Sequence, residues 1–174
     1  MLDLSAGKAA PAAGPDDTLA LVRAVSHAVL NDLAVVRLLL DISRDPVVAA
    51  DPDTGLDAAI ARVAKVGAVL QQLGLASRSG TAPEPTDVAE LLSGARDLLE
   101  VAAGARPLVV DLPVELTVEA DAGEVLQRVL TTVLAVAREV EPGATMTLSL
   151  TADTLGPVVT VDGAAGGSTR LRLG

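Results

Sequence analysis

Apolar residues recur at alternating steps of three and four in the first quarter of the chain. The positions on this stripe are Leu19, Val22, Ser26, Val29, Leu33, Val36 and Leu40. Such steps keep side chains on one face of an α-helix, so the pattern predicts a helix over residues 18–44, which Asp45 and Pro46 end. Residues 1–17 include an Ala-, Gly- and Pro-rich stretch and are predicted to form a flexible N-terminus.

A second stripe predicts another helix between Thr54 and about Gly80, with Thr54 and Asp57 as a capping box. It consists of Leu56, Ala59, Val63, Val66, Leu70 and Leu73. Two helices with matching stripes predict an antiparallel hairpin over residues 18–80. A lone hairpin leaves much of its apolar surface in water, so we expect two copies to pair as a homodimeric four-helix bundle.

The pattern changes after "SGTAPEPT", residues 79–86, which is predicted to be a linker. A helix from Asp87 to about Ala103 should precede two strands in "RPLVVDL" and "VELTVEA". Asp121 should cap a helix that begins "DAGEVLQRVL". Three strands should follow, in "ATMTLSLTA", "GPVVTVDG" and "STRLRLG". The fold class is therefore α+β, with residues 86–174 forming a sandwich whose helices cover one face of a sheet.

Composition excludes several kinds of function. The chain has no Phe, Trp or Tyr and a formal charge of −10, which argue against nucleic acid as a partner. It has no Cys and one His, which excludes disulfides and a Cys/His metal site within one chain. No apolar stretch approaches the roughly 20 residues of a membrane helix, so we expect a cytoplasmic protein without membrane contact.

The segment "SHAVLNDLAVV", with the only histidine and only asparagine of the chain, resembles the histidine box of sensor histidine kinases. The segments "EPTDVAELLSGARDLLE" and "VEADAGEVLQRVLTTVLAVAREVEPG" are similar to those that lead into and contain the nucleotide-binding helix of that family. The resemblance covers residues 18–174. It implies a dimerisation and phosphotransfer hairpin followed by an ATPase-type α/β domain.

The second domain departs from the kinase pattern at the residues that bind nucleotide. Val136 and Thr132 stand where the family carries asparagines, and a Val side chain offers no oxygen ligand to Mg²⁺. Asp162 takes the adenine-binding place, but only residues 163–167 stand where the family has a lid and a further helix. Ala28 replaces the acidic residue beside the histidine. We therefore expect a degenerate ATPase-like domain, no nucleotide cofactor and no ATP-dependent autokinase activity.

A retained histidine beside a disabled kinase domain resembles the dimeric histidine phosphotransferases of bacterial phosphorelays. The resemblance implies that His27 is the phospho-acceptor and that the partner is a response-regulator receiver domain, which brings the Mg²⁺. Neutral imidazole suits this role because it can attack a phosphoryl group in line. Asn31, one turn on, could position the ring, and Arg23, one turn back, could contact phosphoryl oxygens.

Three interpretations stay open at this point. The first is the phosphotransfer protein of a two-component phosphorelay. The second is a non-catalytic, pseudokinase-like regulatory dimer that binds a receiver or a kinase without exchanging phosphate. The third is a kinase remnant with residual nucleotide binding. Each single residue also has a structural alternative: His27 as an exposed helical histidine, Asn31 as plain polarity, Arg23 as a solvated charge, and Gly163, Gly166 and Gly167 as a hairpin turn.

Overall fold

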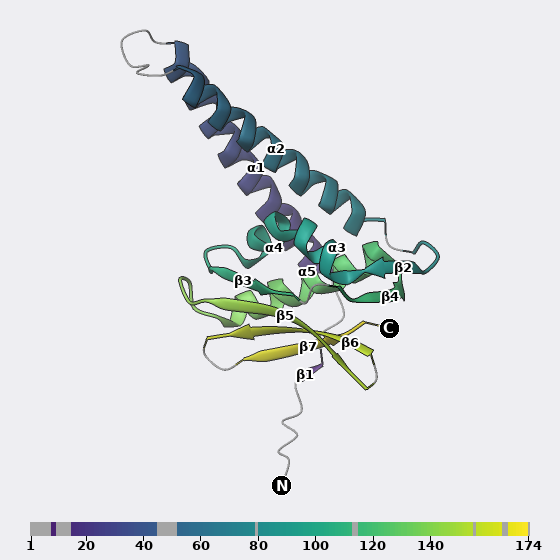
Figure 1. Cartoon of the computed structure of the whole chain (residues 1–174). Coiled ribbons are helices and arrows are strands. Elements are labelled where there is room, and N and C mark those ends of the chain that lie inside the picture. Colours follow the sequence, from purple (N-terminus) through teal and green to yellow (C-terminus); the bar gives the residue numbers. More distant parts are fainter. Residues whose placement is uncertain are drawn as a thin grey trace.

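The predicted hairpin dominates the shape of the molecule. The computed structural model describes residues 8–9, 15–44, 52–78, 80–112, 115–154, 156–164 and 167–173. Helices α1 (Pro15–Arg44) and α2 (Pro52–Ala76) run antiparallel and project away from the rest of the protein (Figure 1). Both begin earlier than predicted, and the cap expected at Thr54 is wrong because Thr54 lies inside α2. Proline suits a first helical position, since its φ is already helical and no partner exists there for an N–H.

A mixed α/β unit lies at the foot of the hairpin. Its helices are α3 (Val88–Gly94), α4 (Arg96–Ala103) and α5 (Ala122–Glu139). Its larger sheet has the strand order β1-β7-β6-β5-β3, formed by β1 (Lys8–Ala9), β3 (Leu108–Asp111), β5 (Met146–Asp153), β6 (Gly156–Gly163) and β7 (Ser168–Arg172). The helices lie between this sheet and the hairpin (Figure 1), which confirms the α+β class and the helices on one face.

One hydrophobic core joins α5, the larger sheet and the foot of the hairpin. On β5, the alternate residues Met146, Leu148 and Leu150 are buried, as expected for a strand with one face on a core. The apolar stripe of α5 packs in the same core, together with Val25 of α1 and Val69 and Ala76 of α2. The end of the hairpin that carries these residues therefore packs on the α/β unit. A substitution there is expected to affect the packing of α4 and α5 as well.

Three local features differ from the sequence prediction. The predicted linker contains a strand, β2 (Glu84–Asp87), which pairs antiparallel with β4 (Thr117–Ala120) in a separate two-stranded sheet. Strand β1 lies in the segment expected to be a flexible N-terminus, and most of that segment lies outside the described residues. The helix predicted over 87–103 divides at Ala95 into α3 and α4, after Ser93 and Gly94, which are weak helix formers.

Asp121 caps α5 as predicted and also holds the segment after the hairpin. Its Oδ1 accepts hydrogen bonds from the backbone N–H groups of Gly123 at 2.8 Å and Glu124 at 3.2 Å. Its Oδ2 accepts from the N–H groups of Gly80 at 2.6 Å and Thr81 at 2.7 Å. Burial alone would raise the pKa of this carboxyl, but the N–H groups of Glu124, Gly80 and Thr81 lower the pKa to about 2.

This low pKa predicts a stability change in acid. A carboxyl whose pKa is lower in the folded state stabilises the fold above its unfolded pKa, and that contribution is lost as pH falls through the folded pKa. Asp121→Asn should therefore lower the free energy of unfolding at neutral pH, and its difference from wild type should shrink between about pH 4 and about pH 2. Urea unfolding across this range measures it, with Asp111→Asn, at an exposed strand end, as the control. A difference independent of pH would contradict the assignment.

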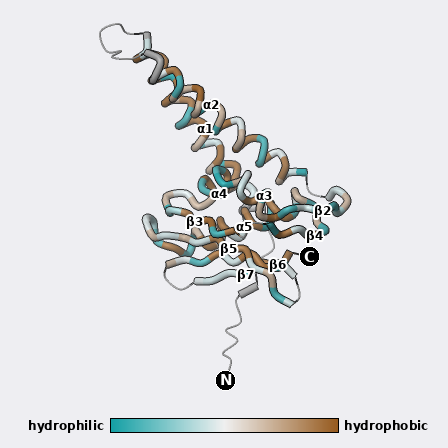
Figure 2. The backbone as a smooth tube through the Cα atoms, in the orientation of Figure 1, coloured by the Kyte–Doolittle hydropathy of each residue, from teal (hydrophilic) through white to brown (hydrophobic). Residues whose placement is uncertain are grey.

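The predicted stripes are only partly buried in the folded chain. The best-buried residue of α1 is Val25, which is 3% exposed and lies off the stripe, whereas the stripe residues Leu33 and Val63 are 46% and 51% exposed. In the described part of the chain, ten of the eleven exposed large apolar side chains belong to the hairpin: Leu19, Val22, Leu30, Leu33, Leu38, Ile42, Leu56, Ile60, Val63 and Leu70. Figure 2 shows apolar residues along both helices. Six of these ten, Leu19, Val22, Leu33, Leu56, Val63 and Leu70, are stripe residues and form an uncovered apolar face, whereas the stripe residues Ala59 and Val66 are buried.

Helix α1 also corrects the expectation that no apolar stretch is long enough to cross a membrane. By length and composition, residues Thr18–Ser43 meet that criterion. One such helix is weak evidence for a membrane span, because a core helix of a water-soluble protein meets the same criterion. Here α1 packs against α2 along one side. Asp32 of α1 forms an ion pair with Arg62 of α2.

Candidate functional site

His27 lies on the exposed side of α1, where the helical spacing places small residues beside it. Ala24 and Ala28 belong to the same side of the helix as the histidine ring, and Asn31 follows one turn later. Nδ2 of Asn31 lies 3.1 Å from Nδ1 of His27, within hydrogen-bond distance. Because Asn31 engages Nδ1, the ring nitrogen that points away from Asn31 is Nε2.

The side chain of His27 lines a cavity of about 520 Å³ between the hairpin and α4. We call this cavity the His27 pocket. Three elements and one loop build it. Its lining consists of Ala24, His27, Ala28, Asn31 and Asp32 of α1, Lys65 of α2, Asp97, Glu100 and Val101 of α4, and Gly104 and Ala105 after α4. The short alanine side chains and a glycine leave room beside the imidazole, so a group of another molecule can approach it.

Charged side chains surround this pocket. Nζ of Lys65 lies 3.1 Å from Oδ1 of Asp97 and 3.9 Å from Oε2 of Glu100. The hydrogen bond to Asp97 is the main cause that raises the pKa of Lys65, and the charges of Asp97, Glu100 and Asp32 act in the same direction. Asp32 also pairs with Arg62 of α2. Among the described residues, no group of three or more His, Cys, Asp or Glu side chains could hold a metal ion.

The structure brings together two of the three predicted site residues. His27 and Asn31 are in contact, whereas Arg23 is exposed on α1 and does not line the pocket. Sequence reasoning missed Lys65, Asp97 and Glu100, because α2 and α4 meet α1 only in the folded chain. The one available signal was composition, since the chain has two lysines and Lys65 is the only lysine of the hairpin.

Two of the residues compared above with nucleotide-binding positions of sensor histidine kinases face the core. Val136 and Thr132 are buried in α5, and Oγ1 of Thr132 donates to the backbone oxygen of Arg128 at 2.9 Å. A Cβ added to Gly163 would clash with Val140, the residue that follows α5, and would lie 3.7 Å from Cγ1 of Val136 in α5, so the end of α5 packs against the start of the β6–β7 turn. In that turn the N–H of Gly163 donates to the oxygen of Gly167 at 2.8 Å, as a hairpin requires.

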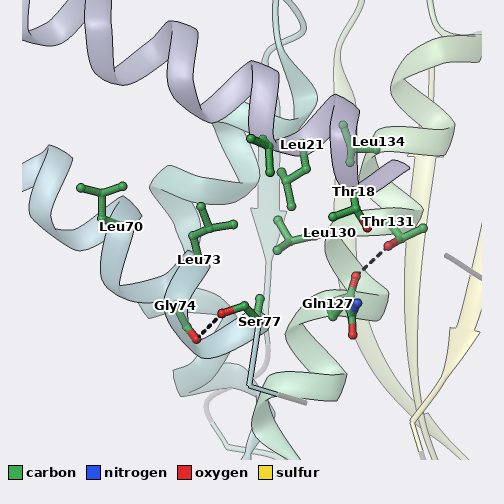
Figure 3. A pocket seen from close by; sticks show the side chains of 12 residues that line it. Thr18, Leu21, Leu70, Leu73, Gly74, Ser77, Gln127, Leu130, Thr131 and Leu134 are labelled. Carbon is green, nitrogen blue, oxygen red and sulfur yellow. Dashed lines mark hydrogen bonds between the residues drawn. The ribbon is translucent and has the colours of Figure 1, made fainter. Parts of the chain in front are cut away.

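A second, apolar cavity of about 390 Å³ lies where α1, α2 and α5 meet. Figure 3 shows leucines of all three helices around it, with Leu21 of α1, Leu73 of α2 and Leu130 of α5 pointing into one space. The hydroxyls of Thr131 and Ser77 bond to backbone oxygens of their own helices. Val22 and Leu70 also belong to the uncovered face of the hairpin, so this cavity is continuous with that face.

Comparison with known proteins identifies the fold. No protein-family model matches the chain, and no curated protein sequence matches it either. Among solved structures, one described as a bacterial phosphotransferase superposes with a TM-score of 0.52 at 10% sequence identity. The match covers 88% of this chain and 70% of that protein. The chain therefore shares the fold of that phosphotransferase across the hairpin and the α/β unit.

Proposed function

We propose that the chain is a histidine phosphotransfer protein of a two-component phosphorelay. His27 exchanges a phosphoryl group with the aspartate of a response-regulator receiver domain, without ATP-dependent autokinase activity. The observation that supports the proposal most is the setting of His27. It is exposed, its Nδ1 lies within hydrogen-bond distance of Asn31, and it borders a pocket partly lined by alanine and glycine. The fold shared with a bacterial phosphotransferase supports it. A receiver partner implies a cytoplasmic protein.

The chemistry requires a lone pair on Nε2 of His27. The amide of Asn31 can present Oδ1 in place of Nδ2, because the two positions are nearly equivalent in shape. Oδ1 then accepts a hydrogen bond from Nδ1–H, and in this tautomer Nε2 carries no proton. Nε2 attacks phosphorus in line, the bond between phosphorus and the receiver carboxylate oxygen breaks, and the carboxylate leaves. The receiver supplies the Mg²⁺, and Arg23, one turn before His27 and exposed on α1, could contact phosphoryl oxygens from outside the pocket.

We also propose that the active form is a homodimer in which two hairpins form a four-helix bundle. The uncovered apolar face is the reason, because monomeric proteins rarely expose large contiguous apolar surface. Leu19, Val22, Leu33, Val63 and Leu70 belong to it and are about half exposed in one chain. Gly67 of α2 has open space where a Cβ would lie, so a second helix can approach α2 closely there.

One observation favours the alternative of a non-catalytic, pseudokinase-like regulatory dimer. Three carboxylates, those of Asp32, Asp97 and Glu100, line the His27 pocket beside the single ammonium of Lys65. A phosphoryl group is repelled by such a lining unless a cation offsets it. In this alternative the dimer binds a receiver or a kinase through the same surface, and no phosphate is exchanged.

The test is incubation of the full chain with a panel of phosphorylated receiver domains. We expect one receiver or more to transfer acid-labile phosphate to the chain. A parallel reaction with ATP and Mg²⁺ alone should give no labelled chain, and calorimetry should show no saturable nucleotide binding. Tight receiver binding without transfer would favour the regulatory dimer instead, and label from ATP would show a kinase remnant.

A further inference from the structure

We propose that Lys65 binds the phosphoryl group on His27, and that Asp97 and Glu100 hold its ammonium until that group arrives. The proposal rests on the proposed function, since it concerns the phosphorylated state of His27. It assigns a phosphate-binding residue to α2 and a regulatory contact to α4. Neither helix carries the histidine.

The placement of Lys65 supports this role. It is the only positively charged residue among those that line the His27 pocket, and it enters from α2 while His27 enters from α1. Its side chain is 42% exposed, so it is free to change direction. A lysine has four methylene groups and no fixed geometry at its ammonium, which lets it move between neighbouring anions.

The charge of the pocket explains why a cation is needed. The lining holds one ammonium and three carboxylates, and Arg62 and Arg96, which lie outside the lining, pair with Asp32 and Glu100. Lys65 is thus the cation that lies at the pocket itself. A phosphoryl group adds about −1.5 to −2 charges at neutral pH. Asp97 and Glu100 are 39% and 40% exposed, so water can take over their solvation when Lys65 turns away. The phosphoryl group and α4 therefore compete for Lys65.

This competition predicts opposite effects for the two sides of the ion pair. Lys65→Met removes the cation and leaves the carboxylates, so phosphorylation of His27 should become slower. The double variant Asp97→Asn, Glu100→Gln keeps the shapes of the two side chains but removes their charges. It therefore releases Lys65 and removes the repulsion between the carboxylates and the phosphoryl group, so phosphorylation of His27 should not become slower. If the ion pair only fastened α4 to the hairpin, both variants would lose the same contact and would change in the same direction.

The experiment uses phosphoramidate, a small phosphodonor that needs no receiver. Nε2 of His27 attacks its phosphorus, the P–N bond breaks, and ammonia leaves. We expect Lys65→Met to form phosphohistidine about 10-fold more slowly than wild type. The Asp97→Asn, Glu100→Gln variant should react at the wild-type rate or faster. Circular dichroism and thermal unfolding check that each variant is folded, and the double variant decides alone if Lys65→Met does not fold.

Two results with the variants would overturn the proposal: wild-type speed in Lys65→Met, or a slower reaction in the double variant. A chain that takes phosphate from phosphoramidate in this Lys65-dependent way but from no receiver would contradict the proposed function and leave the role of Lys65 standing. A wild-type chain that forms no phosphohistidine from phosphoramidate would contradict this proposal directly.

Discussion

Replacing His27 by alanine should reduce phosphoryl transfer from a phosphorylated receiver by more than about 10³-fold, because the only imidazole of the chain is the nucleophile. The fold should survive. His27 is exposed, its hydrogen bond to Asn31 lies at the surface, and alanine is the best helix former. Quenched-flow or gel assays of phosphate on the chain measure the rate, and circular dichroism measures the fold. Asn31→Ala should slow transfer less severely, because it removes only the partner of Nδ1.

Gln71→Ala is the matched control for His27→Ala. Gln71 is an exposed, uncharged residue of the other hairpin helix and lines neither cavity. Its replacement should leave the transfer rate and the helical content unchanged. Transfer at the wild-type rate in His27→Ala would exclude His27 as the acceptor.

Aspartate at both Leu33 and Val63 should dissociate the homodimer or unfold the hairpin. In a symmetric dimer the two substitutions place four carboxylates in one apolar interface, and each unpaired buried charge costs several kcal/mol. Sedimentation equilibrium should then show a loss of dimer at micromolar concentration. Phosphoryl transfer should fall with it if the receiver needs both hairpins.

Leu38→Asp is the control for the dimer prediction. Leu38 is exposed on α1 but lies about 140° around the helix from Leu33, at 100° per residue. It is therefore outside the proposed interface, and the variant should remain dimeric. A wild-type chain that sediments as a monomer of about 17.5 kDa, with the hairpin still helical, would contradict the dimer.

The elements that sequence reasoning found are those with strong local signals. Alternating steps of three and four mark α1 and α2, and Asp121 marks the start of α5 by its side-chain cap. Strand β2 was missed because Pro85 and its neighbours are typical of a linker, and only pairing with β4 makes them a strand. The stripes were placed correctly on the helices, and the structure buries only some of their residues, among them Ala59 and Val66. Periodicity shows that a face is apolar and cannot show which neighbour covers it.

The residues of the candidate site also divide into those that a local sequence signal predicted and those that only the folded chain brings together. His27 and Asn31 are four residues apart on one helix, so their contact follows from helical geometry and was predicted. Lys65 and Asp97 come from two other helices, and their ion pair exists only because the foot of the hairpin packs beside α4. Arg23 has the right spacing but lies outside the pocket, since helical spacing alone does not locate the walls that another helix supplies.

The most direct measurement of the central claim is the position of the phosphate on the chain. The wild-type protein is incubated with the phosphorylated receiver that labels it best, kept at neutral to alkaline pH, and fragmented for mass spectrometry. The account predicts a single phosphorylated residue, His27, with label that is lost in acid and absent from His27→Ala. Phosphate on any other residue, or no phosphate with every receiver of the panel, would contradict it.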